Sequence, residues 1–259
     1  MSESIALVTL TQLEITFLTG LTFLVSFIYS SVGHGGASGY LALMSFFAIP
    51  QEQMATSALC LNLMVAGTAF WNFLRASYFS WRLVWPFILT SVPFAFVGGF
   101  IKVSFSVYSV LLAGVLLFAA RRLVLNFKQN AAETIRSPSI FLSLLIGGLI
   151  GTLSGTVGVG GGIFLSPLLL LSHWASPKHT AGTSAAFILV NSLAGLSGRM
   201  VSHQFQLNYT VTYMMATAFL GGIIGSKLGA NHFSGTWLKR ILAVVLLIAA
   251  LKLLHALPV

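Results

Sequence analysis

The residues of this chain best suited to chemistry are glycines, in a stretch that occurs twice. The first copy reads Ser31-Val32-Gly33-His34-Gly35-Gly36-Ala37, and the second, about 125 residues later, reads Thr156-Val157-Gly158-Val159-Gly160-Gly161-Gly162. Glycine lets the backbone turn sharply and lets a ligand approach it closely, but it destabilises the interior of a helix. The two copies therefore predict two breaks in helical structure, where backbone N–H groups can meet a small ligand.

The composition places these breaks inside a lipid bilayer. Of 259 residues, 57% are hydrophobic and only 7% are charged, whereas a soluble domain carries about a quarter charged residues. There is no Asp, and the four acids are Glu3, Glu14, Glu52 and Glu133. The net charge of +9 fits basic residues in the connections of a membrane protein better than a nucleic-acid-binding surface, because no motif that reads RNA or DNA is present.

Ten apolar segments, separated by polar residues, predict the helices. They cover about 13–30, 37–49, 54–74, 82–101, 106–125, 139–156, 163–174, 179–200, 208–228 and 236–256. Eight have about the ~20 residues that cross a bilayer, whereas the second and seventh have only 12–13 residues and each follows a glycine stretch. The simplest interpretation is a helix that enters the membrane, an unwound turn, and a half-helix that returns to the side it came from.

The segments predict an all-α integral membrane protein made of two inverted-topology repeats of five segments each, with discontinuous helices at the glycine motifs. The first repeat takes residues 1–125, a polar linker takes 126–138, and the second repeat takes 139–259. The halves match in further places: Ala55-Thr56-Ser57-Ala58 with Gly182-Thr183-Ser184-Ala185, Asn62 with Asn191, and Gly98-Gly99 with Gly221-Gly222. Several matches in the same order indicate internal duplication.

The basic residues predict the orientation. With the linker in the cytoplasm, the inner loops hold Arg75, Arg82, Arg121, Arg122, Lys128, Arg136, Lys178, Lys227, Lys239 and Arg240, and the outer side holds Lys102, Arg199 and Lys252. This bias predicts a multi-pass protein of the plasma (inner) membrane with both termini outside. The sequence around Met1 has no basic flank, so we expect the first apolar segment to be retained rather than cleaved as a signal peptide.

Two half-helix N-termini that face one cavity would bind an anion through free N–H groups and helix dipoles. The absence of carboxylates in the predicted membrane interior favours an anion over a cation as the substrate. The predicted substrate-binding residues are Gly33, His34, Gly35, Gly36, Thr56, Ser57, Asn62, Gly158, Gly160, Gly161, Gly162, Thr183, Ser184 and Asn191. His34 is the one titratable side chain predicted in the interior, and it could pair with the anion or couple a proton.

Each of these residues also has a purely structural interpretation. The hydroxyls can cap helices, the two asparagines can clamp one helix to another, and the glycines can serve close helix packing. Arg75 and Arg199 follow the asparagines near the membrane edges, where arginine either anchors a helix at the interface or attracts an anion. No cofactor and no metal site is expected, and a coupled H⁺ or Na⁺ and a homodimer are left open.

Paired VGxGG-type motifs, each followed by a helix carrying G/A-T-S, Asn and Gly, resemble the TauE/SafE family of sulfite and organosulfonate exporters. The resemblance covers about residues 13–256. It implies a secondary transporter that exports small sulfur-containing anions, such as sulfite, sulfoacetate or related sulfonates, by alternating access around a site at the midplane of the membrane. The first motif departs from the second by carrying His34 where the second has Val159.

Three alternatives remain at this stage. An anion channel would share the same site, and a structural subunit would show no response to substrate. An intramembrane serine protease is suggested by the string Gly36-Ala37-Ser38-Gly39, provided that Ser38 and His34 come within hydrogen-bond reach. The second half lacks this string, and a protease does not explain a duplication of the whole chain.

Overall fold

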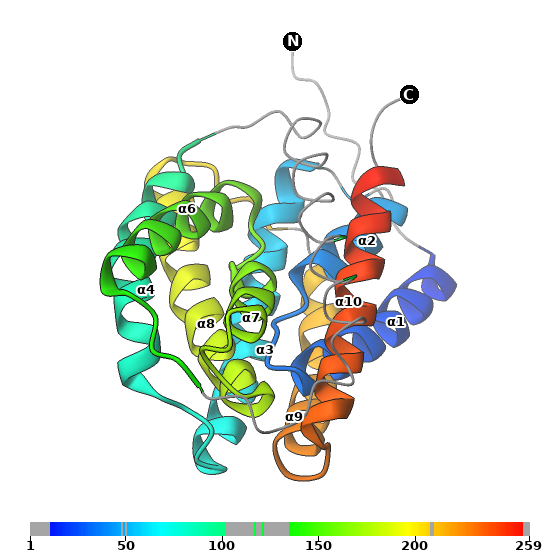
Figure 1. The fold of residues 1–259 in the computed structure, drawn as a ribbon. Helices are drawn as coiled ribbons and strands as arrows, with labels where there is room; N and C mark the ends of the chain where they lie inside the picture. The colour runs from blue at the N-terminus through cyan, green and yellow to red at the C-terminus, as the bar shows by residue number, and fades with distance from the viewer. Residues whose placement is uncertain are drawn as a thin grey trace.

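The computed structural model describes residues 11–47, 49, 51–101, 117, 121, 135–207 and 210–255, and within these ranges it contains helices, turns and loops but no strand. The helices of these ranges are α1 (Gln12–Ser31), α2 (Ala37–Phe46), α3 (Gln51–Arg75), α4 (Trp81–Gly98), α6 (Ile140–Val157), α7 (Gly162–Leu171), α8 (Pro177–Val201), α9 (Thr210–Asn231) and α10 (Gly235–His255) (Figure 1). The predicted segment 106–125 and the linker 126–138 lie mostly outside the described residues.

Six of the helices, α1, α3, α4, α6, α8 and α9, are long and apolar enough to cross a membrane. Many of their outward-facing side chains are large and apolar, such as Phe17, Leu89 and Phe141. Such a surface is stable in lipid and costly in water. The chain is therefore a multi-pass membrane protein.

The two short segments are helices of ten residues each, α2 and α7. At about 1.5 Å per residue each is only about 15 Å long, half of a hydrocarbon core of about 30 Å. Helix α7 ends at Leu171, three residues before its predicted end, because Ser172 leaves the helical conformation and His173 adopts a left-handed φ of 56°. Both half-helices thus begin at a glycine turn, and α7 ends at the level where α6 begins, since the Arg136 N–H donates to the His173 carbonyl at 2.9 Å.

Small residues define two close helix contacts. On α6, Gly147, Gly151 and Gly155 lie against Phe87, Ser91 and Ala95 of α4; on α9, Gly221, Gly225 and Gly229 lie against Phe23, Phe27 and Ser31 of α1. Spacings of four residues put each glycine set on one face of its helix, so that the backbones approach closely. In each pair of helices, residues with higher numbers on one helix contact residues with higher numbers on the other. Helix α4 therefore runs parallel to α6, and α1 runs parallel to α9.

Further contacts assemble these pairs into two three-helix bundles. Asn72 of α3 donates to Ser226 of α9 at 2.8 Å, and Gly198 near the end of α8 lies against Phe96 near the end of α4. One bundle therefore contains α1, α3 and α9, and the other contains α4, α6 and α8 (Figure 1). The fourth helix of each predicted half packs against the helices of the other half.

Helices α3 and α8 join the two bundles and run antiparallel. Leu59 near the start of α3 lies by Gly195 near the end of α8, and Phe73 near the end of α3 lies by Gly182 near the start of α8. The bundle of α1, α3 and α9 thus points opposite to the bundle of α4, α6 and α8. Helix α1 is accordingly antiparallel to α6.

One end of the molecule gathers the basic connections. Lys178 at the start of α8 donates to the Tyr78 hydroxyl at 3.4 Å and to the Ala230 carbonyl at 3.0 Å, which joins the α3–α4 and α9–α10 connections. The described basic residues on these connections and adjoining helix ends are Arg75, Arg82, Arg136, Lys178, Lys227, Lys239 and Arg240. Arg199 lies at the opposite end, near the end of α4. Which end faces the cytoplasm is still a prediction.

Candidate functional site

The first glycine turn, residues 32–36, connects α1 to α2. Its backbone folds back on the end of α1, since Gly33 N–H donates to the Ser30 carbonyl and His34 N–H to the Tyr29 carbonyl, each at 2.9 Å. Gly33 has a φ of 77° and Gly36 a φ of 96°, which glycine adopts without strain. The sequence thus ends one helix and begins another within five residues.

The second glycine turn, residues 158–161, connects α6 to α7 in a similar way. Gly158 has a φ of 81° and donates to the Ser154 carbonyl at 2.9 Å, and Gly161 has a φ of 82° just before α7. The turns differ in the middle, because Gly160 has a φ of 78° whereas its counterpart Gly35 is not left-handed. The predicted helix breaks are present at both motifs.

Each glycine turn packs against the long helix of the opposite half. A Cβ on Gly33 would overlap the backbone of Ala181 in α8, and a Cβ on Gly158 would lie 2.8 Å from the Ala55 carbonyl oxygen in α3. Contacts that close leave no room for a side chain. The glycines at these positions are therefore required by packing as well as by backbone conformation.

Asn62, near the middle of α3, ties the two turns together. Its Oδ1 accepts from the N–H of Ala37, the first residue of α2, at 3.1 Å, and its Nδ2 donates to the carbonyl of Val159 at 3.2 Å. The side chain is fully buried. A Cβ on either Gly35 or Gly160 would meet it, so both turns converge on this amide halfway along the helix.

Asn191, the counterpart of Asn62 in α8, does not form such a bridge. Its Nδ2 donates to the Phe187 carbonyl of its own helix at 2.8 Å, and its buried Oδ1 has no partner within the described residues. The next residue, Ser192, also has a buried and unpartnered hydroxyl, which lies against Gly160. The structure thus leaves two polar groups of α8 unsatisfied beside the second turn.

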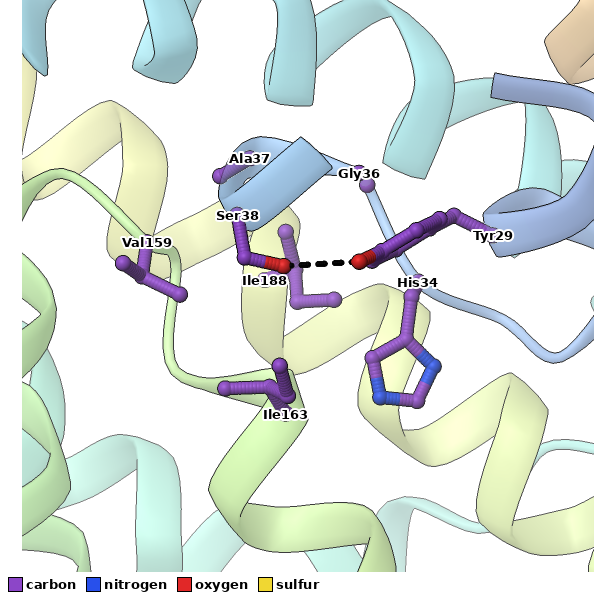
Figure 2. Close-up of a pocket in the computed structure, with 9 residues that line it drawn as sticks. Tyr29, His34, Gly36, Ala37, Ser38, Val159, Ile163 and Ile188 are labelled. Atoms are coloured by element: carbon purple, nitrogen blue, oxygen red, sulfur yellow. Dashed lines mark hydrogen bonds between the residues drawn. The ribbon is translucent and has the colours of Figure 1, made fainter. Parts of the chain in front are cut away.

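A small cavity lies where the two turns meet, lined by Tyr29, His34, Gly35, Gly36, Ala37, Ser38, Val159, Ile163 and Ile188 (Figure 2). His34 is only 2% exposed, and its Nδ1 lies 3.1 Å from the Val32 carbonyl. Its Nε2 is buried without a partner in the described part of the chain. Of the predicted turn residues, His34, Gly35 and Gly36 line this cavity, and a single imidazole lies in its wall.

Backbone N–H groups without an acceptor in the described chain gather in the second turn, of which Val159 lines this cavity together with Ile163 of α7. In the second turn and the start of α7, the N–H groups of Val159, Gly160, Gly161, Gly162 and Ile163 donate to no acceptor among the described residues. Free N–H groups at the start of a helix carry the positive end of its dipole. This run of five donors can hold a small anion without any charged side chain.

The hydroxyl clusters of the two halves have different surroundings. Ser57 donates to the Gln53 carbonyl at 2.7 Å, and Thr56 reaches the Gln204 carbonyl at 3.5 Å. In α8, Ser184 shares a hydrogen bond of 2.7 Å with Ser166 of α7, whereas the buried Thr183 hydroxyl has no partner in the described ranges. The Thr183 hydroxyl is therefore the member of these clusters without a partner in the described residues, and it is not among the residues that line the cavity.

The two arginines that were singled out from the sequence lie in unlike places. Arg75 is exposed at the end of α3, with its guanidinium 4.9 Å from the centre of the Trp71 ring. Arg199 is only 6% exposed, and its Nη2 donates to the carbonyls of Gly155 at 3.3 Å and Thr156 at 2.8 Å. Arg75 thus has the setting of an interfacial anchor, whereas Arg199 holds the last turn of α6 just before the second glycine turn.

The protease interpretation requires contact between Ser38 and His34. The Ser38 hydroxyl instead shares a hydrogen bond of 2.9 Å with the Tyr29 hydroxyl (Figure 2). The Nδ1 of His34 faces the Val32 carbonyl, and its Nε2 contacts no serine of the described chain. The nucleophile and base are thus not paired.

Several residues around the site were not selected from the sequence. Tyr29, Ser38, Val159, Ile163 and Ile188 line the cavity, and Ser192 lies against Gly160. Tyr29 and Ser38 flank the first glycine stretch closely, so their polar side chains in an apolar segment were a usable signal. Ile163 and Ile188 resemble any other apolar residue of a membrane helix, so the sequence gives no signal for them.

Comparison with known proteins identifies relatives along most of the chain. Residues 18–253 match the family described as "Sulfite exporter TauE/SafE". The chain is 35% identical over 235 residues to the "Probable membrane transporter protein y4hK" of Sinorhizobium fredii, which covers 90% of this chain and 95% of that protein. A "Probable membrane transporter protein" of Methanocaldococcus jannaschii is 24% identical over 78% of this chain and 80% of its own length. No solved structure matches.

Proposed function

Because the chain belongs to the sulfite exporter TauE/SafE family, we propose that it exports small sulfur-containing anions across the plasma (inner) membrane. The family and the curated relatives are membrane transporters by name, so this chain is a membrane transporter. The substrate class is sulfite, sulfoacetate or related sulfonates. The site is the cavity between the two glycine turns.

The observation that carries this proposal is the run of five N–H groups from Val159 to Ile163, which have no acceptor among the described residues and whose first and last members line that cavity. These groups are all donors, and the chain's four acids lie at positions 3, 14, 52 and 133, outside both turns. A cation would find no carboxylate there, whereas an anion with several oxygens can accept many N–H bonds at once. Sulfite and sulfonate groups have three such oxygens.

The side chains around the turns then have distinct roles. The Asn62 amide holds the two turns at the separation that the anion requires. The Ser192 hydroxyl of α8 offers a further polar contact beside Gly160 of the second turn, and the buried Thr183 hydroxyl and Asn191 Oδ1 of the same helix also have no partner in the described residues. Their present lack of partners is costly in a buried setting, and a bound ligand would relieve it.

An inverted repeat is supported by the directions and contacts of the helices. Helix α1 is antiparallel to α6, and the α1–α9 contact is the counterpart of the α4–α6 contact when the halves are exchanged. The matched glycine turns and the matched half-helices α2 and α7 fit the same relation. Residues 1–125 and 139–259 are the proposed repeats, which the linker 126–138 joins.

Alternating access would then involve the two bundles rather than the two sequence halves. Helix α4 packs on α6 and α8, and helix α9 packs on α1 and α3, so neither repeat can move as a unit without breaking these contacts. Movement along the antiparallel α3–α8 contact would instead expose the site to one side and then to the other. The positive-inside rule places the end with Arg82, Lys178 and Arg240 in the cytoplasm.

Transport in proteoliposomes tests the proposal. Purified protein should give an uptake of radiolabelled sulfite or sulfoacetate that saturates with concentration and that other sulfonates inhibit. The same anions should raise the melting temperature, because they bind the folded state. Flux that rises linearly without saturation would favour an anion channel, and no flux or thermal shift with any member of an anion panel would contradict an anion carrier.

A further inference from the structure

The orientation of His34 determines which of its nitrogens can carry the proton in the neutral form. Nδ1 lies 3.1 Å from the carbonyl of Val32, which can only accept a hydrogen bond. Nδ1 must therefore carry a hydrogen, and a neutral imidazole has only one. Nε2 is then an unprotonated acceptor, and it is buried without a partner among the described residues.

An anion cannot form a favourable contact with this nitrogen as it stands. Both the anion oxygens and an unprotonated Nε2 are hydrogen-bond acceptors, so bringing them together in a buried cavity is unfavourable. If Nε2 gains a proton, the ring becomes a cation with donors on both sides. It then keeps the bond to Val32 and offers a charge-assisted bond to the anion.

Among the residues that the structure describes, no other charged group lies around the ring to take over this role. Tyr29 of α1 faces the ring edge-on, with ring centres 6.5 Å apart, and its hydroxyl is bonded to Ser38 of α2. Tyr40 of α2 lies against Gly36, α8 contributes Ile188 to the cavity, and α7 contributes Ile163 and the backbone of Gly162, which lies close enough to interact with the ring. Tyrosine is the only other titratable side chain type lining the described cavity, and it is uncharged near neutral pH.

We propose that the site loads one proton together with each anion, with His34 Nε2 as the proton-binding atom. The inference rests on the proposed anion site between the glycine turns. The proton comes from solution on the side where the anion enters and returns to solution on the side where the anion leaves, and no covalent bond of the anion changes. The loaded carrier thus moves one negative charge fewer than the anion alone.

The repeat makes this coupling a property of one turn only. The position equivalent to His34 in the second turn is Val159, which has no titratable group and contributes its backbone N–H and carbonyl. The stoichiometry should therefore be one proton for each anion. A site with a histidine in both turns would take up two.

The experiment uses wild-type protein in proteoliposomes with a pH-sensitive dye inside and sulfoacetate outside. Sulfoacetate stays fully ionised between about pH 6 and pH 8, because its acidic groups titrate well below that range. We expect internal acidification that is proportional to anion uptake, at one proton per anion, and an apparent Kd that weakens by up to about tenfold per pH unit at the alkaline end. Saturable uptake without acidification, or a Kd that does not change with pH, would overturn the inference.

Three variants separate coupling from binding. His34→Gln offers an amide N–H without titrating, so we expect sulfoacetate uptake that is independent of pH and moves no proton. His34→Val copies the second turn, and we expect the anion affinity to fall on the order of tenfold or more, as for loss of a charge-assisted bond. His232→Gln, at an exposed histidine at the far end of α9, is the matched control and should behave as wild type.

The outcomes also distinguish this inference from the proposed function. Saturable anion uptake with no proton movement would remove the role of His34 and leave the carrier function standing. A His34→Gln protein that still acidifies the vesicles would likewise overturn the assignment of the proton to this ring. Absence of anion uptake in the wild type would contradict the proposed function itself.

Discussion

The two glycine turns have similar backbone conformations but differ in their hydrogen bonds and in the side chains that they bring to the site. In the first turn, the leading N–H of α2 is already bonded to Asn62, and a histidine side chain lines the cavity. The N–H groups of Gly35 and Gly36 have no acceptor in the described part of the chain, and in the second turn the same holds for the longer run from Val159 to Ile163, where no titratable side chain is present. The last turn of α6, which leads into it, is held by Arg199.

This difference shows how a duplicated motif can divide the work of one site. The second turn supplies fixed donors, which need no proton to bind an anion. The first turn supplies the group whose charge can change. Asn62 is hydrogen-bonded to both ends of the site, so a movement of one turn changes the position of the other. The variants below alter one turn, its equivalent, or the link between them.

The largest effect on stability and transport is expected for Asn62, which connects the two turns. Asn62→Leu leaves the buried Ala37 N–H and Val159 carbonyl without the amide, at about 1–3 kcal/mol for each orphaned group. Asn191→Leu removes an amide whose oxygen has no partner, so its stability should stay close to wild type. We expect a clearly lower melting temperature and no transport for Asn62→Leu, and transport loss with little change in melting temperature for Asn191→Leu. Equal melting temperatures would contradict the bridging role of Asn62.

Glycine substitutions should have the next largest effect on transport, and the effect should differ between the two turns. Gly160→Ala meets both a left-handed φ of 78° and the side chains of Asn62, Ile188 and Ser192. The backbone strain alone costs about 1–2 kcal/mol. Gly35→Ala meets the side chain and the Cα of Asn62 but no left-handed φ, so it should be milder, while Gly20→Ala, with nothing within 4 Å of its Cβ, is the control. Unchanged flux in protein that inserts normally, with Gly160→Ala or with a bulkier residue at either position, would contradict the close approach of substrate to the turns.

A smaller effect is expected at Arg199. Arg199→Met removes the donors to Gly155 and Thr156 at the end of α6 but also removes a buried charge, so the two effects on stability partly cancel and leave about 1 kcal/mol. Transport should fall more than stability, because the second turn begins two residues after Thr156. Arg199→Lys should restore part of the rate. Arg75→Met, at an exposed position, should leave the melting temperature and the anion KM unchanged, and a loss as large as that at Arg199 would contradict this difference.

The smallest effects concern the hydroxyls. Thr183→Val removes a buried hydroxyl without a partner in the described residues, so stability should change by less than about 0.5 kcal/mol while the KM for the anion rises about fivefold. Thr56→Val removes a long bond to Gln204 and should leave the KM alone. Melting curves and uptake kinetics of both variants test this pair. A rise in KM for Thr56→Val and not for Thr183→Val would reverse their roles.

Much of the fold follows from the order of apolar and polar residues. The helix bounds agree with the predicted segments to within three residues in the described ranges, and both short segments are half-helices. Apolar length and glycine stretches report where a helix can cross and where it must break. They do not indicate which helices contact one another, so the packing of α4 on α6 and of α9 on α1 could not be predicted from them.

The chemistry of the site was only partly predictable for the same reason. Asn62 follows Thr56 by six residues whereas Asn191 follows Thr183 by eight, so the two amides lie on different faces of their helices and only Asn62 reaches the opposite turn. Arg199 looked like an edge residue because it lies near the end of an apolar segment, but the end of α6 covers it. In each case a partner that is distant in sequence decides the role.

The exchanged fourth helices have a consequence for how the protein is made. Helix α4 enters the membrane before α6 and α8 have been synthesised. Its Ser91, and the face that later packs on three glycines of α6, are therefore exposed to lipid until then. Helix α9 closes the first bundle only near the end of synthesis. A chain that ends after the first half therefore cannot complete either bundle. Two halves made as separate polypeptides would have to associate before either could fold fully.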